Sequence, residues 1–177
     1  GARQPDTDNF RLWEVAGTAH ADRHLMGADT ADRLDCGAPI NDGPLHVVAK
    51  AALRHLVGWV DGGSPPPAAP RLELTEDEGA TVRDEDGIAV GGIRTPPVEV
   101  PVQVLTGEQG PSGEIICILS GSTLPMPPER IAERYPTVTD YEQQYADAVD
   151  ASIEAGVVLD EDREAIEAYA RPDLVPG

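Results

Sequence analysis

The clearest pattern of apolar and polar positions in the chain lies between residues 45 and 60. Apolar residues recur there at the spacing of a helix with one buried face. Pro44 suits the first helical position because its missing N–H would have no helical partner, and Asp61–Gly63 provides a stop. The apolar positions are Leu45, Val48, Ala49, Ala52, Leu53, Leu56, Val57 and Val60, and His46, Lys50 and Arg54 line the other side. The pattern predicts an amphipathic helix that buries its apolar side.

A short apolar segment and a loop with a histidine precede this helix. Phe10–Val15 is rich in apolar and aromatic residues and is bounded by polar residues and glycine, which is typical of a strand. Gly17 permits a sharp turn after it, and His20 follows in the loop. Residues 21–43 are predicted to form a polar loop that can hold a helical turn.

Beyond the helix, the proline-rich segment 64–70 is the clearest internal boundary. After it the apolar period changes to two, which predicts strands. Asp86-Gly87 fits a tight hairpin turn, and Pro101 limits the alternating segment 98–104 to an edge or irregular strand. Glu114–Leu119 is predicted as a buried strand because it is an unbroken apolar run.

The last third of the chain turns helical and acidic. Helices are predicted over residues 128–135, 139–155 and 160–170, with Gly156 and Pro172 as stops. The predicted organisation is therefore a helix-containing segment 1–61, a connector 62–70, and an extension 71–177 with β-hairpins followed by two or three helices.

The charge balance of the 177 residues excludes polyanionic partners. The chain has 13 Lys and Arg against 32 Asp and Glu, a net charge of −19, and Lys50 is its only lysine. Nucleic acids and anionic membranes are bound by clustered cations. No apolar run approaches the roughly 18 residues of a membrane helix. We expect a soluble chain that binds neither nucleic acid nor membrane and, since it opens at Gly1 without an initiator Met, a piece of a longer protein.

His20 is the sharpest candidate for catalysis. A strand, a glycine-assisted turn, a loop histidine and a later amphipathic helix form the order in which an α/β-hydrolase presents its catalytic base. Such a base must reach the hydroxyl of a nucleophile while a carboxylate orients its imidazole. On pattern alone, an ordinary surface histidine is the more common alternative.

Two other groups of residues suggest sites. On a helix, His20 and His24 would share a face and could bind a metal, with aspartates of the same loop completing the site. However, Ala21 stands where the zinc-protease signature needs Glu, so a solvated acidic loop is favoured and no metal is predicted. Arg94, within the glycine-containing segment 91–96, could clamp a carboxylate of a substrate, although a structural ion pair is favoured.

Several features argue against other sites. Residues 76–78 and 84–87 are acidic but lack the 12-residue ligand order of a calcium loop, so they are interpreted as hairpin turns. Cys36 and Cys117 could form one disulfide, but their small and apolar neighbours favour buried free thiols. No serine lies in a Gly-x-Ser-x-Gly nucleophile elbow. The serines are Ser64, Ser112, Ser120, Ser122 and Ser152. The chain therefore lacks a complete catalytic triad of its own.

Longer motifs carry a specific resemblance. The run Trp13–Asp22, with the sequence Trp-Glu-Val-Ala-Gly-Thr-Ala-His-Ala-Asp, resembles the last-strand and histidine segment of a bacterial α/β-hydrolase-domain family of serine esterases. The resemblance extends through Gln4–Phe10, Cys36, Ile40–His46, Trp59-Val60, Pro65-Pro66, Gly91–Pro96, Gly121–Thr123, Tyr135-Pro136 and Tyr141. It thus covers nearly the whole chain.

The resemblance implies a fold and a function. It implies the C-terminal part of an α/β-hydrolase fold, with the last core strand, the histidine loop and the final helix, followed by an α+β extension. His20 would be the triad histidine, with the nucleophilic serine and the acid in an upstream half of the same enzyme. The substrate would be a small-molecule ester, with no cofactor. The alternative from another class is a non-catalytic acidic binding or scaffold module.

Overall fold

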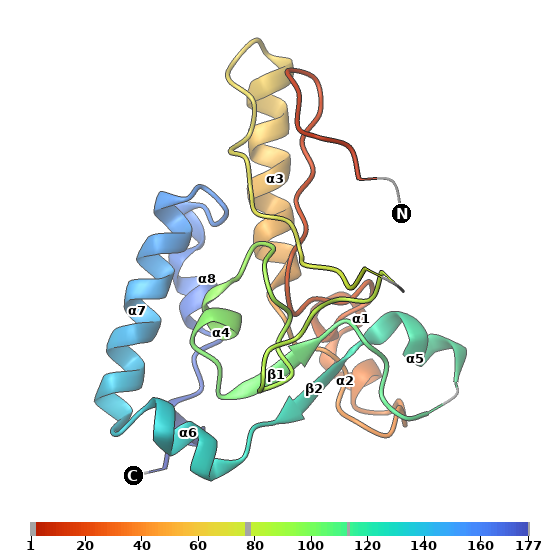
Figure 1. Ribbon diagram of the computed structural model, residues 1–177, viewed down its shortest axis with the longest axis vertical. Helices are drawn as coiled ribbons and strands as arrows, with labels where there is room; N and C mark the ends of the chain where they lie inside the picture. The colour runs from red at the N-terminus through yellow and green to blue at the C-terminus, as the bar shows by residue number, and fades with distance from the viewer. Residues whose placement is uncertain (1–2, 77–78, 113, 177) are drawn as a thin grey trace.

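A computed structural model describes residues 3–76, 79–112 and 114–176 of the chain (Figure 1). Helices predominate, and one two-stranded sheet lies near the centre. In chain order the elements are α1 (Arg23–Met26), α2 (Ala28–Ala31), α3 (Leu45–Val60), α4 (Pro96–Glu99), β1 (Gln103–Thr106), α5 (Ile115–Ser120), β2 (Ser122–Pro125), α6 (Pro128–Arg134), α7 (Val138–Glu154), the 3₁₀ turn η1 (Asp160–Asp162), α8 (Arg163–Glu167) and the 3₁₀ turn η2 (Pro172–Leu174).

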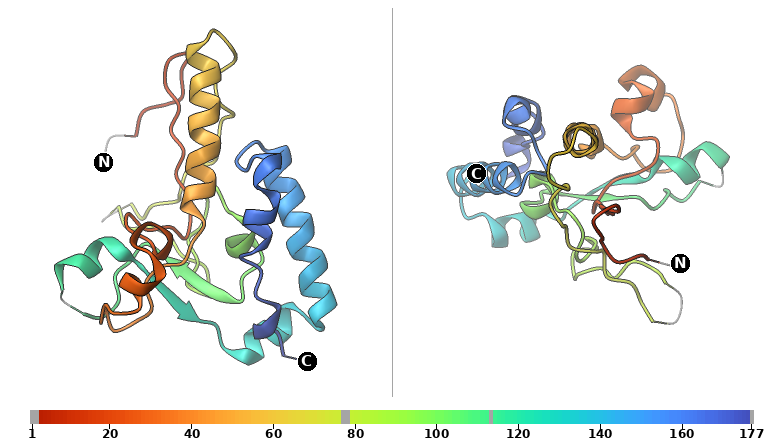
Figure 2. Two further views of the ribbon diagram at one scale, coloured as in Figure 1. Left: turned by 180° about the vertical axis from the view of Figure 1, so that it is seen from behind. Right: turned by 90° about the horizontal axis from the view of Figure 1, so that it is seen from above.

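Helix α3 confirms the predicted helix, but its apolar side is not buried as expected. Val48 is buried, whereas Leu53, Val57 and Val60 are 62%, 59% and 78% exposed. The polar side instead contacts the C-terminal helices, with Lys50 Nζ 2.6 Å from Asp162 Oδ1. Figure 2 shows α3 between α7 and α8 on one side and α1 and α2 on the other. The described residues therefore leave much of the apolar side of α3 facing solvent.

The predicted strand Phe10–Val15 is wrong in its extent. Within the described residues, this segment forms two isolated bridges, an antiparallel one between Phe10 and Thr7 and a parallel one between Val15 and Ile93. The amide of Ala16 donates to the Ile93 carbonyl over 2.9 Å, and the Ile93 amide donates to the Glu14 carbonyl over 2.7 Å. A regular strand requires a continuous ladder, so most of this segment is extended without being a strand.

In the extension, the Asp-Gly pair predicted a turn correctly, whereas the alternation of apolar residues predicted strands less well. The amide of Gly87 donates to the Asp84 carbonyl at 3.0 Å, which confirms the hairpin turn; residues 77 and 78 of the other predicted turn lie outside the described residues. The predicted strand 98–104 is wrong in its first half, because Pro96 and Pro97 begin the short helix α4. Strand β1 starts only at Gln103 and pairs antiparallel with β2, Gln103 opposite Pro125 and Thr106 opposite Ser122.

The predicted buried strand Glu114–Leu119 is also wrong, because residues 115–120 form helix α5. Only Cys117 and Ser120 of this helix are buried, whereas Ile115 is 81% exposed. An unbroken apolar run has no periodicity that separates a strand from a helix. The prediction is therefore wrong both in the backbone of this segment and in the burial of most of its side chains.

The three predicted C-terminal helices are confirmed, the last one as η1 and the shorter α8. Thr137 begins α7 as an N-cap, since its hydroxyl accepts a hydrogen bond from the Asp140 amide at 3.1 Å. Tyr145 is buried, and its hydroxyl donates to the Ile166 carbonyl at 3.0 Å. The main core lies between these helices, α4 and the sheet. With α4 and α5, the extension holds more helices than the two or three predicted.

Residues of all three predicted ranges share a second, smaller core. Trp13, Val48, Ala69 and Val157 belong to one apolar cluster, and the Trp13 indole N–H donates to the Pro67 carbonyl over 2.8 Å. The connector therefore packs along the extended N-terminal segment. Among the described residues, no helix is both long enough and apolar enough to cross a bilayer.

Candidate functional site

The loop that carries His20 is tightly held at its base. Gly17 adopts a φ of +68°, and a Cβ at this position would lie 2.7 Å from Val98 Cγ2, so the turn requires glycine. The fully buried side chain of Asn41 donates to the Gly17 carbonyl and to the Thr106 carbonyl of β1, each over 3.0 Å. Asn41 therefore fastens the turn before His20 to the central sheet.

The other end of the loop is fastened as well. The Ala21 amide donates to the Leu119 carbonyl at the end of α5, at 2.9 Å. The carboxylate of Asp22, a residue only 3% exposed, caps α1 by accepting from the Leu25 amide at 2.8 Å. Between these anchors His20 is exposed, and within the described residues its imidazole makes no hydrogen bond or ion pair. The geometry presents a free imidazole on a fixed backbone.

A disulfide ties the loop region to α5. Cys36 and Cys117 are bonded across 81 residues of sequence, so the prediction of free thiols is wrong. Both cysteines are 1% exposed and pack with Ala31 and Ile40. Small and apolar neighbours are equally common around a buried disulfide and around buried free thiols. The neighbouring residues in the sequence therefore did not distinguish a disulfide from free thiols.

The structure pairs His24 with His46 rather than with His20. The two rings are stacked, with centroids 3.5 Å apart and planes 5° from parallel. In the part of the chain that the structure describes, no group of three or more His, Cys, Asp and Glu residues is arranged to hold a metal ion. His46 Nδ1 is buried without a hydrogen-bond partner among the described residues.

The surroundings of His46 favour its neutral form. Burial lowers the pKa of His46, and the neighbouring His24 lowers it further, while Asp22, Asp42 and Asp162 oppose this effect. The unfolded chain therefore binds a proton at this residue more readily than the folded protein does. Stability from a neutral His46 is complete above the unfolded pKa of about 6.5 and is lost as the pH falls through the lower folded pKa.

We expect His46→Phe to reduce the loss of stability on acidification. The variant keeps a flat ring against His24 but cannot take up a proton. The measurement is urea unfolding of both proteins between pH 5 and pH 8. His20→Gln, in the exposed loop, is the control and should keep the acid sensitivity of the parent protein. An equally steep loss of stability in His46→Phe would contradict the assignment to His46.

Arg94 is engaged within its own turn. Its Nε donates to Glu99 at 2.6 Å, Nη1 to the Ala89 carbonyl at 2.7 Å, and Nη2 to the Val98 carbonyl at 3.0 Å. The ion pair with Glu99 agrees with the structural alternative that the sequence favoured. A contact between Arg94 and a substrate stays a prediction.

Sequence reasoning did not single out Asn41 or the contact between His24 and His46. Asn41 lay inside the motif Ile40–His46 that carried the family resemblance, within the predicted polar loop 21–43. The stacking of His24 on His46 depends on how the loop folds back over the start of α3. A pattern of spacing cannot predict such a contact.

Comparisons with known proteins identify the family to which this chain belongs. The chain matches a family model described as an alpha/beta hydrolase domain over residues 1–168. The chain therefore belongs to this family, which confirms the resemblance seen in the sequence motifs and indicates an enzyme of the hydrolase type. No curated protein and no solved structure matches the chain.

Proposed function

We propose that this chain is the C-terminal portion of a serine ester hydrolase in which His20 is the catalytic base. The observation that carries the proposal is the loop itself. In a chain of the α/β-hydrolase family, His20 is exposed and makes no hydrogen bond to any described residue, while both ends of its loop are anchored. A base that must move a proton needs a free imidazole, and a fixed backbone keeps that imidazole in position.

In this mechanism His20 would accept the proton of a serine hydroxyl as the serine oxygen attacks the ester carbonyl. It would then return the proton to the departing alcohol, which leaves an acyl-enzyme. His20 would then take a proton from water as the water oxygen attacks the acyl-enzyme. It would return this proton to the serine oxygen as the carboxylic acid product leaves. These steps need no cofactor.

The serine and the acid are proposed to lie in an upstream portion of the same enzyme. The side chains of three serines here are already engaged: Ser120 donates to the Ile116 carbonyl, Ser122 to the Glu108 carbonyl and Ser152 to the Ala148 carbonyl. Neither Ser64 nor Ser112 lies in a nucleophile elbow. The chain offers a base without a matching nucleophile.

The outward side of α3 supports the same proposal. Leu53, Leu56 and Val57 are each about half exposed or more, at 62%, 47% and 59%. An apolar surface this continuous on one helix is commonly an interaction surface. In an α/β-hydrolase a helix that follows the last strand covers the core sheet, so we propose that the upstream portion packs against this side.

Labelling with a fluorophosphonate probe tests the proposal. We expect this chain alone to remain unlabelled and to leave a p-nitrophenyl ester intact, because it lacks the nucleophile. Joined to its upstream portion, it should be labelled at an upstream serine and should cleave the ester. Strong labelling of the isolated chain at one of its own five serines would contradict the proposal. Failure of the joined protein to react would contradict it as well.

A further inference from the structure

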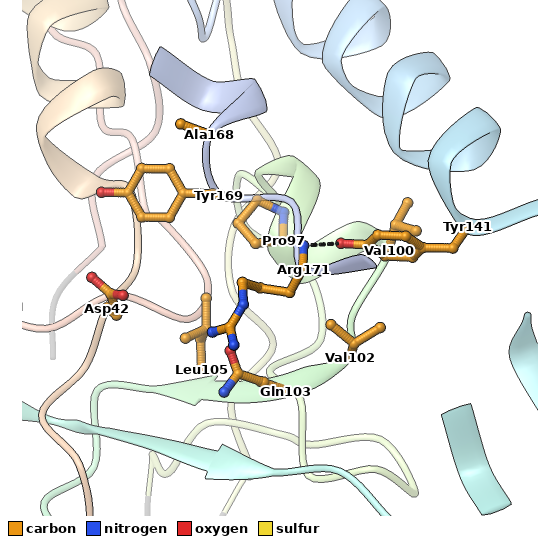
Figure 3. A pocket seen from close by; sticks show the side chains of 10 residues that line it. All are labelled: Asp42, Pro97, Val100, Val102, Gln103, Leu105, Tyr141, Ala168, Tyr169 and Arg171. Carbon is orange, nitrogen blue, oxygen red and sulfur yellow. Dashed lines mark hydrogen bonds between the residues drawn. The ribbon is translucent and has the colours of Figure 1, made fainter. Parts of the chain in front are cut away.

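A cavity of about 290 Å³, which His20 does not line, lies between the start of α3, strand β1 and the C-terminal helices (Figure 3). Its size is at the lower end of the range for small-molecule sites. Figure 3 shows Asp42 and Tyr169 at one side, with the side chain of Arg171 extending toward Leu105 and Gln103. The remaining lining is mostly apolar, with Pro97, Val100, Val102, Leu105, Tyr141 and Ala168. An apolar cavity with a few convergent polar groups is the usual form of a small-ligand site.

Some polar groups of this cavity already make hydrogen bonds within the protein, and others do not. Two nitrogens of Arg171, Nε and Nη2, donate to the carboxylate of Asp173 at 2.9 Å and 2.8 Å. By contrast, the carboxylate of Asp42 and the hydroxyl of Tyr169 make no hydrogen bond within the described residues. Asp42 is exposed at the rim, so its carboxylate can be reached by a ligand.

The charges around Asp42 also indicate that its carboxylate is available to a ligand. Four charged or titratable side chains influence Asp42, namely Arg23, Asp22, Arg171 and His24. Each of the two arginines is already balanced by its own carboxylate, Arg23 by Asp32 and Arg171 by Asp173. The carboxylate of Asp22 caps α1. Within the described residues, the Asp42 carboxylate therefore forms no ion pair of its own.

We propose that this cavity binds a small organic ammonium ion with a short apolar chain. The ammonium group lies at the rim against the Asp42 carboxylate and donates a further hydrogen bond to the Tyr169 hydroxyl. The apolar chain occupies the space along Val100, Val102 and Leu105. The net charge of −19 raises the local concentration of cations around the whole chain and so favours their entry. The Tyr169 ring adds attraction for a cation that lies near its face.

Three probes of similar size test the charge preference: n-butylammonium, butanol and butyrate. Binding to the full chain is measured by the chemical-shift changes of the protein NMR spectrum during titration. We expect n-butylammonium to shift the signals of Gln103, Tyr169 and Arg171, whereas butanol should bind more weakly and butyrate should not bind. Stronger binding of butyrate would overturn the proposal, because the cavity would then be an anion site of Arg171. No binding of n-butylammonium would overturn it also.

Two variants separate the site from general attraction to an acidic protein. Asp42→Asn keeps the size of the side chain but removes its charge, and should weaken binding of n-butylammonium about tenfold or more. Glu142→Gln removes one charge from the exposed surface of α7 and should leave the affinity unchanged. Equal weakening in both variants, or none in Asp42→Asn, would overturn the proposal. Unchanged circular dichroism of each variant shows that its fold is intact.

Discussion

Replacing His20 by alanine in the enzyme joined to its upstream portion should lower kcat for ester hydrolysis by roughly 10⁴- to 10⁶-fold, the loss typical of removing a triad residue. The reason is chemical, because His20 is the proposed acceptor of the serine proton. The KM for the ester should change little, since the imidazole is needed for proton transfer rather than for holding the substrate. Steady-state rates with a p-nitrophenyl ester measure both quantities.

His24→Ala is the matched control for this experiment. His24 lies four residues further along and is also exposed, so its loss removes a neighbouring imidazole without removing the proposed base. We expect His24→Ala to keep most of the activity. If a metal bound by both histidines were responsible for catalysis, the two variants would lose activity together.

Chemical rescue distinguishes a missing base from a disturbed loop. Added imidazole can enter the space vacated in His20→Ala and take up the proton, so it should restore part of kcat. The restored rate should rise with pH as free imidazole loses its proton. A variant that keeps the full rate without imidazole would contradict a catalytic role for His20.

The elements that the sequence predicted best are those whose signals are local and repeated. Helices α3 and α7 have many periodic positions, so a few unusual residues do not obscure the pattern. The turn at Gly87 depends on glycine, which alone adopts a φ of +83° without strain. Such features are set within a short stretch of chain.

The errors occurred where distant contacts decide the backbone or the burial. The run Glu114–Leu119 is helical and largely exposed, and its place is fixed by Cys117 bonded to Cys36, 81 residues away in sequence. Likewise, Val47, Val48 and Ala51 of α3 are buried while Leu53, Leu56 and Val57 stay exposed, and Lys50 contacts Asp162 of η1 at 2.6 Å. Hydrophobicity alone assigns the apolar side of a helix to a core, but it does not say whether that core lies within the same chain.

The same reasoning applies to the candidate site. The position of His20 after a glycine turn could be predicted from sequence, because Gly17 and His20 are only three positions apart in the chain. The anchors of its loop could not, since Asn41 reaches the sheet at Thr106 and Ala21 reaches α5 at Leu119. These hydrogen bonds join segments that are brought together only by the complete fold.

The disulfide leads to the largest expected effect on stability. Replacing both Cys36 and Cys117 by serine should lower the free energy of unfolding by about 4 kcal/mol, within the usual range of about 2–5 kcal/mol. The bond closes a loop across 81 residues, so its removal gives the unfolded chain much more conformational freedom. In urea unfolding, the midpoint should fall by roughly 1–2 M.

Reduction of the parent protein is the matched control. A reducing agent should destabilise the parent protein by a similar amount and should leave the double serine variant unchanged. Alkylation in denaturant gives a direct count of thiols: without reductant the parent protein should take up no iodoacetamide, and after reduction it should take up two equivalents, one for each cysteine. Two alkylated cysteines before reduction would show free thiols and contradict the bond.

Loss of the disulfide should also affect the loop that carries His20. Cys117 lies in α5, whose last residues bind the loop region from both sides: the Leu119 carbonyl accepts from the Ala21 amide at 2.9 Å, and the Ser120 carbonyl accepts from the Asn41 amide at 3.1 Å. Once α5 is no longer tied to Cys36, these anchors hold a less stable helix. We therefore expect the reduced, joined enzyme to lose kcat before it unfolds, because the backbone that positions His20 loosens first.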